Sequence, residues 1–160
     1  MKHANFREAF KLVACVLLCQ LAGVLGSIFT LQSIPAWYAS LNKPFFTPPG
    51  WVFGPVWVTL YAIMGVSLYL AWKENRKKGA SRAYAFFGVQ LALNALWSVA
   101  FFGLRSPLYG LATIILLLAV LALTIREFHR ISRTAGLLLV PYLAWCCFAA
   151  LLNLAVFLMN

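Results

Sequence analysis

The sequence predicts an all-α integral membrane protein, built as a five-transmembrane-helix bundle in a single domain over residues 1–160. Of the 160 residues, 64% are hydrophobic and 10% are charged, which is far from the soluble average. Apolar runs of about 20 residues recur, long enough to cross the roughly 30 Å hydrocarbon core of a bilayer. Basic residues stand at the ends of these runs. The chain therefore has no room for a soluble module.

The first predicted helix covers residues 12–31, an apolar run preceded by basic residues. The run is longer than the apolar region of a secretory signal and has no clear cleavage site, so we expect a retained helix. Small and polar residues recur along it at steps of three and four: Gln20, Gly23, Ser27 and Thr30. They share one face, which is either a helix-packing seam or the wall of a ligand site.

Residues 32–50 are predicted to form a stiff, aromatic loop, which we call the lid. Pro44, Pro48 and Pro49 cannot donate backbone hydrogen bonds and hold the residues before them in extended conformations. A flexible tether would instead be polar and rich in glycine and serine. We therefore expect the lid to fold over a site between the helices.

The second predicted helix covers residues 51–72, and Pro55 lies in its first turn or so, where proline is tolerated. Trp57 and Tyr61 are an i,i+4 pair and share one face of this helix. A basic turn over residues 73–82 follows it.

The third predicted helix covers residues 83–104 and carries a polar and aromatic stripe. The stripe consists of Gln90, Asn94, Trp97, Ser98 and Phe101. Uncharged amides inside a membrane are costly unless they are hydrogen-bonded, so this stripe faces protein or a cavity. A separate ridge of small residues, Ala85, Gly88 and Ala92, suits helix or subunit packing.

Two further helices complete the predicted bundle. The fourth, residues 108–125, is almost wholly aliphatic and is expected to be scaffold with one face in contact with membrane lipid. A basic turn over residues 126–133 leads to the fifth helix, residues 136–159. One face of the fifth helix carries Tyr142, Trp145, Ala149 and Asn153.

Lysine and arginine are unevenly shared between the two sides of this bundle. With five crossings, the N-terminus and the turns after the second and fourth helices lie on one side. That side holds eleven of the thirteen basic residues: Lys2, Arg7, Lys11, Lys73, Arg76, Lys77, Lys78, Arg82, Arg126, Arg130 and Arg133. Only Lys43 and Arg105 lie opposite. By the positive-inside rule, we expect the N-terminus in the cytoplasm, and the lid and the C-terminus outside.

The polar residues exclude several classes of function. The net charge of +10 sits at the ends of apolar runs rather than in a groove-sized patch, so nucleic-acid binding is not expected. Glu8, Glu74 and Glu127 are the only acids and lie outside the predicted helices, which disfavours a proton-driven antiporter. Neither a Cys/His ligand spacing nor a constellation for nucleophilic catalysis is present, and we expect no metal site and no required cofactor.

Aromatic residues dominate what remains. Trp57, Tyr61, Trp97, Tyr142 and Trp145, with the Asn94 amide, are suited to line a pocket for a flat, largely apolar ligand. The alternative is that these rings fill the bundle core or form interfacial belts. For the tryptophans at the ends of predicted helices, at positions 37, 51 and 72, the belt interpretation is the better one.

Four segments carry a resemblance to a known family. They are W-Y-A-S-L-N-K-P, F-T-P-P-G-W-V-F-G-P-V-W-V-T-L-Y, A-L-N-A-L-W-S-V-A-F-F-G and V-P-Y-L-A-W-C-C-F-A-A-L-L-N. In their order and spacing they resemble the tryptophan-rich sensory protein/translocator protein family, which includes the peripheral-type benzodiazepine receptor. The match covers essentially the whole chain from the first helix to the fifth.

The resemblance implies a five-helix bundle, usually a homodimer, that binds tetrapyrroles such as protoporphyrin IX and haem and drug ligands of the isoquinoline carboxamide type. It places the ligand between the helices beneath the first loop. The matching positions here are Pro48, Phe53, Trp57, Tyr61, Asn94, Trp97, Trp145 and Ala149. Some bacterial members degrade protoporphyrin oxidatively in light, and the tryptophans implicated match Trp57 and Trp145.

We therefore expect a tetrapyrrole-binding protein of the bacterial envelope that acts as a sensor, carrier or regulator of porphyrin levels. The alternatives are a light-dependent porphyrin-degrading enzyme and a membrane scaffold that binds a partner protein. No histidine lies inside a predicted helix, so metal-free porphyrin is expected to bind without coordination. The basic residue of the mitochondrial cholesterol pattern is absent after Arg133, which disfavours sterol binding through that pattern.

Overall fold

The computed structural model describes residues 2–74 and 80–160, with side chains from Phe6 onward. Its helices are α1 (Lys2–Ser33), the π-helix η1 (Ile34–Tyr38), α2 (Gly50–Lys73), α3 (Ala80–Ser98), the π-helix η2 (Val99–Gly103), α4 (Pro107–Ile131), α5 (Arg133–Leu138) and α6 (Val140–Met159). No strand occurs in the described residues. Five helical segments are long and apolar enough to cross a membrane. The predicted all-α bundle of five transmembrane helices is confirmed.

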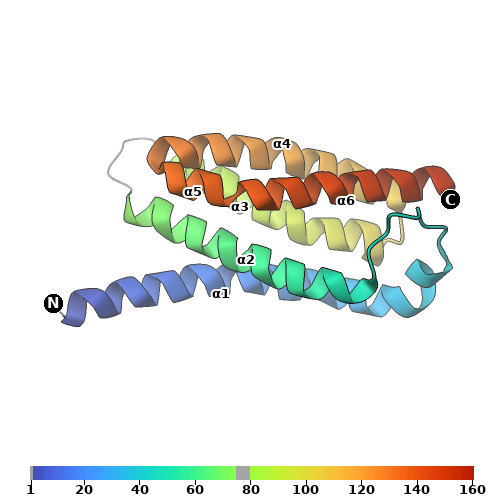
Figure 1. The fold of residues 1–160 in the computed structure, drawn as a ribbon, viewed down its shortest axis with the longest axis horizontal. Coiled ribbons are helices and arrows are strands. Elements are labelled where there is room, and N and C mark those ends of the chain that lie inside the picture. Colours follow the sequence, from blue (N-terminus) through green and yellow to red (C-terminus); the bar gives the residue numbers. More distant parts are fainter. Residues whose placement is uncertain (1, 75–79) are drawn as a thin grey trace.

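The long helices lie side by side along one axis (Figure 1). Helix α1 packs against α2 and α3, α3 against α4, and α4 against α6, while the short α5 contacts α2 and α4. The N-terminus, the end of α2 and the junction of α4 with α5 gather at one end of the bundle (Figure 1). The C-terminus and residues 41–49 gather at the other end. This arrangement separates the basic end of the bundle from the lid.

The first helix is longer than predicted at both ends. It begins at Lys2, and residues 32–40 are helical through η1 and the two residues after it, so the lid is residues 41–49. Pro35 cannot donate the usual backbone hydrogen bond, and the wider π turn accommodates it. Rings packed against η1 hold this extra turn, since Trp37 lies 5.4 Å from Phe101. Such tertiary contacts are invisible to local propensity.

The prediction of a basic turn over residues 126–133 is wrong. Helix α4 continues to Ile131, and only Ser132 is extended, with φ −144° and ψ 119°. The Ser132 hydroxyl accepts a hydrogen bond from the backbone N–H of Ala135 and caps α5. A second break at Leu139 precedes Pro141, which lies in the first turn of α6. The other predicted basic turn, 73–82, falls partly on residues 75–79, outside the described residues.

Close approach at the basic end fixes helix α2 against α1. A side chain at Gly65 would overlap the backbone of Val16, so the two helices touch there through glycine. The hydroxyl of Ser67 donates to the carbonyl of Ala135 at 2.7 Å and ties α2 to α5. These contacts join α1, α2 and α5 in the half of the bundle away from the lid.

Candidate functional site

Two cavities lie beneath the lid. The one directly under it, the lid cavity, has a volume of about 250 Å³ and contacts η1, the lid, α2, η2 and α6. The second, the helix cavity, has a volume of about 400 Å³ and lies between α1, α2 and α3. They share the lining residues Thr30, Ile34, Gly50, Phe53 and Trp97. Because they share walls, the two cavities form one site that passes from the lid into the bundle.

A single turn and one cation shape the lid. Both the backbone N–H and the hydroxyl of Thr47 donate to the carbonyl of Pro44, at 3.0 and 2.7 Å, which closes a turn and places Pro48 at the cavity wall. The ammonium of Lys43 donates to the carbonyls of Tyr38 and Leu41, at 2.8 and 2.9 Å. Lys43 is the only charged residue among those that line the two cavities.

Hydrogen bonds fasten the lid to the end of α6. The backbone N–H of Asn42 donates to the side-chain oxygen of Asn160 at 2.9 Å, and the Asn160 amide donates back to the Asn42 carbonyl at 3.0 Å. The Asn42 side chain also donates to the carbonyl of Met159, at 3.3 Å. We call these contacts the lid clasp. The clasp holds the lid closed over the lid cavity.

Aromatic rings form the walls of the site. Trp97 stacks on Phe101 with a centroid separation of 5.5 Å and an interplanar angle of 19°. Trp57 lies 5.6 Å from Tyr61 on the wall of the helix cavity. Flat rings spaced in this way present apolar faces to a planar guest.

The inner polar groups of the site are largely bonded to one another. The hydroxyl of Tyr61 donates to the Asn94 side-chain oxygen, and the Asn94 amide donates to the hydroxyl of Tyr142 at 2.8 Å. One turn further along α3, the Trp97 indole donates to the Asn153 side chain at 3.2 Å. These bonds hold the polar and aromatic side chains of α2, α3 and α6 in fixed positions before any ligand binds.

The structure brings together seven of the eight site residues that the resemblance implied. Pro48 and Ala149 line the lid cavity, Trp57, Tyr61 and Asn94 line the helix cavity, and the two shared residues Phe53 and Trp97 line both.

Trp145 is the exception, since it lines neither cavity in the part of the chain that the structure describes. Its ring packs behind Phe53, at a centroid distance of 6.0 Å. Its indole nitrogen is buried and has no hydrogen-bond partner among the described residues. Trp145 therefore supports the cavity wall through Phe53.

The polar face of α1 is both a helix-packing seam and a wall of the site, the two alternatives that the sequence left open. Gln20, Gly23, Ser27 and Thr30 all line the helix cavity. The Gln20 amide also donates to the carbonyl of Val58 at 2.9 Å, and Gly23 lies against the ring of Tyr61. The whole face thus forms part of the cavity wall, and Gln20 and Gly23 also pack α1 against α2.

The two faces of α3 differ as the sequence predicted. Gln90 is fully buried, and both polar atoms of its amide lack a hydrogen-bond partner within the described residues. Ala85, Gly88 and Ala92 are exposed, and a side chain added at Gly88 meets nothing within 4 Å. The ridge of small residues therefore packs against no helix of its own subunit in the described part of the chain.

Sequence reasoning missed Tyr38, Lys43 and Phe102 as cavity residues. The sequence could have indicated Lys43 as a site residue, because it is the one cation within an aromatic, proline-rich loop. Tyr38 and Phe102 carried none, since only the π turns of η1 and η2 bring them together, 5.6 Å apart. No group of three His, Cys, Asp or Glu side chains gathers within the described residues.

The chain is similar in sequence to known proteins over nearly its whole length. The model of the TspO/MBR family matches residues 15–159, which is nearly the whole chain. The chain belongs to the TspO/MBR family. It is 51% identical over 150 residues to the tryptophan-rich protein TspO of Archaeoglobus fulgidus, covering 94% of this chain and 97% of that protein.

Two more distant relatives carry different names. The chain is 41% identical over 134 residues to the translocator protein of Homo sapiens, covering 82% of this chain and 79% of that protein. It is 37% identical over 124 residues to the tryptophan-rich sensory protein of Cereibacter sphaeroides, covering 78% and 77%. The family and the five apolar helices together make this a multi-pass membrane protein.

Proposed function

We propose that this TspO/MBR family member binds a tetrapyrrole, protoporphyrin IX or haem, in the two adjoining cavities beneath the lid. The observation that carries the proposal is the shape and chemistry of that site. Joined, the two cavities of about 250 and 400 Å³ fall within the range expected for small-molecule sites, roughly 300–1,000 Å³. Their walls are aromatic rings with few polar groups. A flat, apolar macrocycle matches such walls.

Lys43 supplies the polar end of the proposed site. A tetrapyrrole of this kind carries carboxylates on one edge, and Lys43 is the only charge on the cavity walls. Its ammonium now bonds only to backbone carbonyls, and a carboxylate is a stronger partner for a cation than a neutral carbonyl. The macrocycle would then lie with its acidic edge under the lid and its apolar edge toward Trp57.

The lid suits a role in sensing, carrying or regulating porphyrin. A clasp of exposed hydrogen bonds closes the site, and each such bond contributes only about 0.5–1.5 kcal/mol, so thermal opening is frequent enough for exchange. No histidine lines either cavity, so haem would bind without the usual axial ligand. Isoquinoline-carboxamide-type ligands, being flat and uncharged, would occupy the same aromatic walls.

A titration with protoporphyrin IX in the dark tests this proposal. Binding should quench the intrinsic tryptophan fluorescence of the purified protein. Lys43→Gln should weaken binding of protoporphyrin IX about five- to tenfold, the loss of one charge-assisted bond, and leave binding of its uncharged dimethyl ester unchanged. Arg105→Gln is the matched control, because Arg105 is a basic residue in the connection between η2 and α4 and lines neither cavity. Equal losses for the acid and the ester would remove Lys43 from the site.

A second candidate function is light-dependent oxidative degradation of the bound porphyrin. Trp57 favours it, because its indole lines the helix cavity and its ring lies 5.6 Å from Tyr61 and 6.3 Å from Tyr142. Such a cluster of oxidisable rings suits transfer of one electron from the indole to an excited macrocycle. The reduced macrocycle would pass this electron to dioxygen, giving superoxide, and the indole radical cation would take one electron back from the macrocycle, so that the porphyrin is oxidised and dioxygen is reduced. The test is the loss of the porphyrin absorption band under fixed illumination, compared with a protein-free control.

We further propose that the lid end of the bundle faces away from the cytoplasm, in a bacterial envelope membrane. The support is the distribution of basic residues, because among those that the structure describes only Lys43, before α2, and Arg105, between η2 and α4, lie in the connections away from the basic end. A reporter fused after Asn160, which hydrogen-bonds to the lid, should register outside the cytoplasm. A cytoplasmic signal from that fusion would reverse the orientation.

A further inference from the structure

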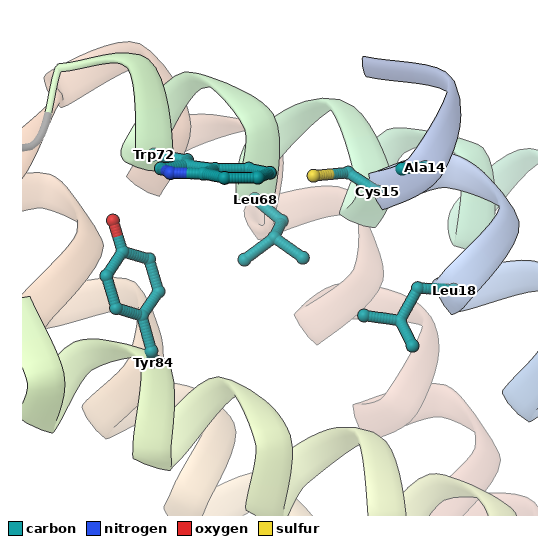
Figure 2. A pocket seen from close by; sticks show the side chains of 6 residues that line it. All are labelled: Ala14, Cys15, Leu18, Leu68, Trp72 and Tyr84. Carbon is teal, nitrogen blue, oxygen red and sulfur yellow. The ribbon is translucent and has the colours of Figure 1, made fainter. Parts of the chain in front are cut away.

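A groove unrelated to the two cavities lies at the basic end of the bundle, between α1, α2 and α3 (Figure 2). Its volume is about 330 Å³. Its lining residues are Ala14, Cys15, Leu18, Leu68, Trp72 and Tyr84. About two turns of α2 separate it from the helix cavity, between Leu68 and Tyr61, and on α3 the separation is larger. On α1 its residue Leu18 is two positions from Gln20 of the helix cavity, which places the two side chains on different faces of the helix.

The wall of this groove offers hydrocarbon contacts and almost no hydrogen bonds. Figure 2 shows Leu18 and Leu68 reaching into the hollow, with the Trp72 indole beside the Cys15 sulfur. The hydroxyl of Tyr84 already donates to the carbonyl of Ala71, at 3.2 Å. An occupant of this groove is therefore an apolar chain.

The rim of the groove, on the side away from the bundle centre, is basic. Lys11 lies one turn before Ala14 and Cys15 on α1, and its ammonium is 5.5 Å from the centroid of the Trp72 ring. Lys73 follows Trp72 directly, and its ammonium lies 5.9 Å from the Tyr69 ring.

One carboxylate partly offsets this charge. Glu8 accepts a hydrogen bond from Lys11 at 2.8 Å and another from Tyr69 at 3.1 Å. Two lysines against one glutamate leave the rim with a net positive charge. Trp72 is half exposed, in the manner of tryptophans that sit at a membrane interface.

We propose that this groove binds an anionic phospholipid from the leaflet at the basic end of the bundle. One acyl chain lies along the apolar wall, and the headgroup phosphate lies between Lys11 and Lys73. Basic pockets between transmembrane helices recognise anionic headgroups in this way, and each lysine near the surface contributes about fivefold in affinity. A zwitterionic phospholipid makes the same chain contacts and gains little from the rim.

Native mass spectrometry on the purified full chain tests the proposal. The protein is equilibrated in detergent with phosphatidylglycerol and phosphatidylcholine of identical acyl chains, and the lipid retained per subunit is counted. The parent should retain phosphatidylglycerol at least fivefold over phosphatidylcholine. The double variant Lys11→Gln with Lys73→Gln should lose this preference, while Arg105→Gln at the opposite end should keep it. Equal retention of both lipids by the parent would overturn the proposal.

Two further variants separate a defined site from general lipid contact. Leu18→Trp should fill the groove and reduce retention of both lipids, whereas Leu116→Trp on α4, at a residue of similar exposure, should not. Glu8→Gln removes the offsetting carboxylate and should raise retention of phosphatidylglycerol, a gain that a misfolded protein cannot show. Unchanged retention in Leu18→Trp and Glu8→Gln together would mean a lipid shell without a site. Protoporphyrin binding beneath the lid reports separately on folding and on the proposed function.

Discussion

The hydrogen bonds that centre on Asn94 make a strong prediction about stability. Asn94 is 4% exposed and joins three helices, by accepting from Tyr61 on α2 and donating to Tyr142 on α6. Asn94→Leu keeps a similar volume but removes both bonds. It leaves the hydroxyl of Tyr142, whose residue is fully buried, without its Asn94 partner.

Two terms decide the size of the effect. Hydrogen bonds between helices in a membrane contribute on average about 0.6 kcal/mol each, so losing two costs about 1 kcal/mol. A buried polar group left unsatisfied costs about 1–3 kcal/mol more, and the Tyr142 hydroxyl, which is shielded from solvent, keeps only a weak hydrogen bond to the Cys146 thiol. We expect Asn94→Leu to destabilise the protein by about 2–4 kcal/mol. For a chain of this length, that corresponds to a Tm lower by at least about 5 °C.

The diagnostic variant is the triple one, Asn94→Leu with Tyr61→Phe and Tyr142→Phe. Replacing all partners by apolar groups of similar shape removes the orphaned hydroxyls, so the triple variant should regain at least about 1 kcal/mol over Asn94→Leu alone. Unfolding in mixed micelles, followed by circular dichroism, measures each variant against the parent. A triple variant as unstable as the sum of its single changes would refute the view that these three groups act as one network.

Three other changes test the lid, the cavity wall and the outer face of α3. Asn160→Ala removes the two bonds of the clasp that its side chain makes with Asn42, so release of protoporphyrin should accelerate about five- to 150-fold by stopped-flow fluorescence. An unchanged release rate would mean that the clasp does not gate the site. Trp57→Phe should change dark affinity by about 1 kcal/mol or less, the scale of one aromatic contact, and abolish any light-driven loss of porphyrin. Trp145→Phe should change that loss less, because Trp145 lies behind Phe53, and equal bleaching rates in parent and Trp57→Phe would eliminate the relay. Gly88→Leu should fold normally, since a side chain there meets nothing within 4 Å. It should weaken the self-association that the resemblance implies, as measured by chemical cross-linking in lipid, and an unchanged cross-linked fraction would exclude this ridge as an interface.

The sequence by itself determined the fold class and much of the site. Span length and hydropathy identify the five helices, because a bilayer demands an apolar stretch of a set length from every crossing. Helical spacing placed Gln20, Asn94 and Trp97 on inward faces, because a costly polar group in a membrane must face protein or a cavity. The prolines at 48 and 49 fixed the start of α2 at Gly50.

Only the tertiary structure decided where the lid begins and which rings form its floor. The π turns of η1 and η2 depend on contacts between residues far apart in the chain, such as Trp37 with Phe101. The position of Trp145 could not be predicted from the sequence either. It lies behind Phe53 because of how α6 packs against α2, and the face of α6 that carries it does not decide this. Periodicity gives the direction of a side chain from its helix axis. The distance between helices, which decides whether that side chain meets a neighbour or a cavity, is set by the packing of the whole bundle.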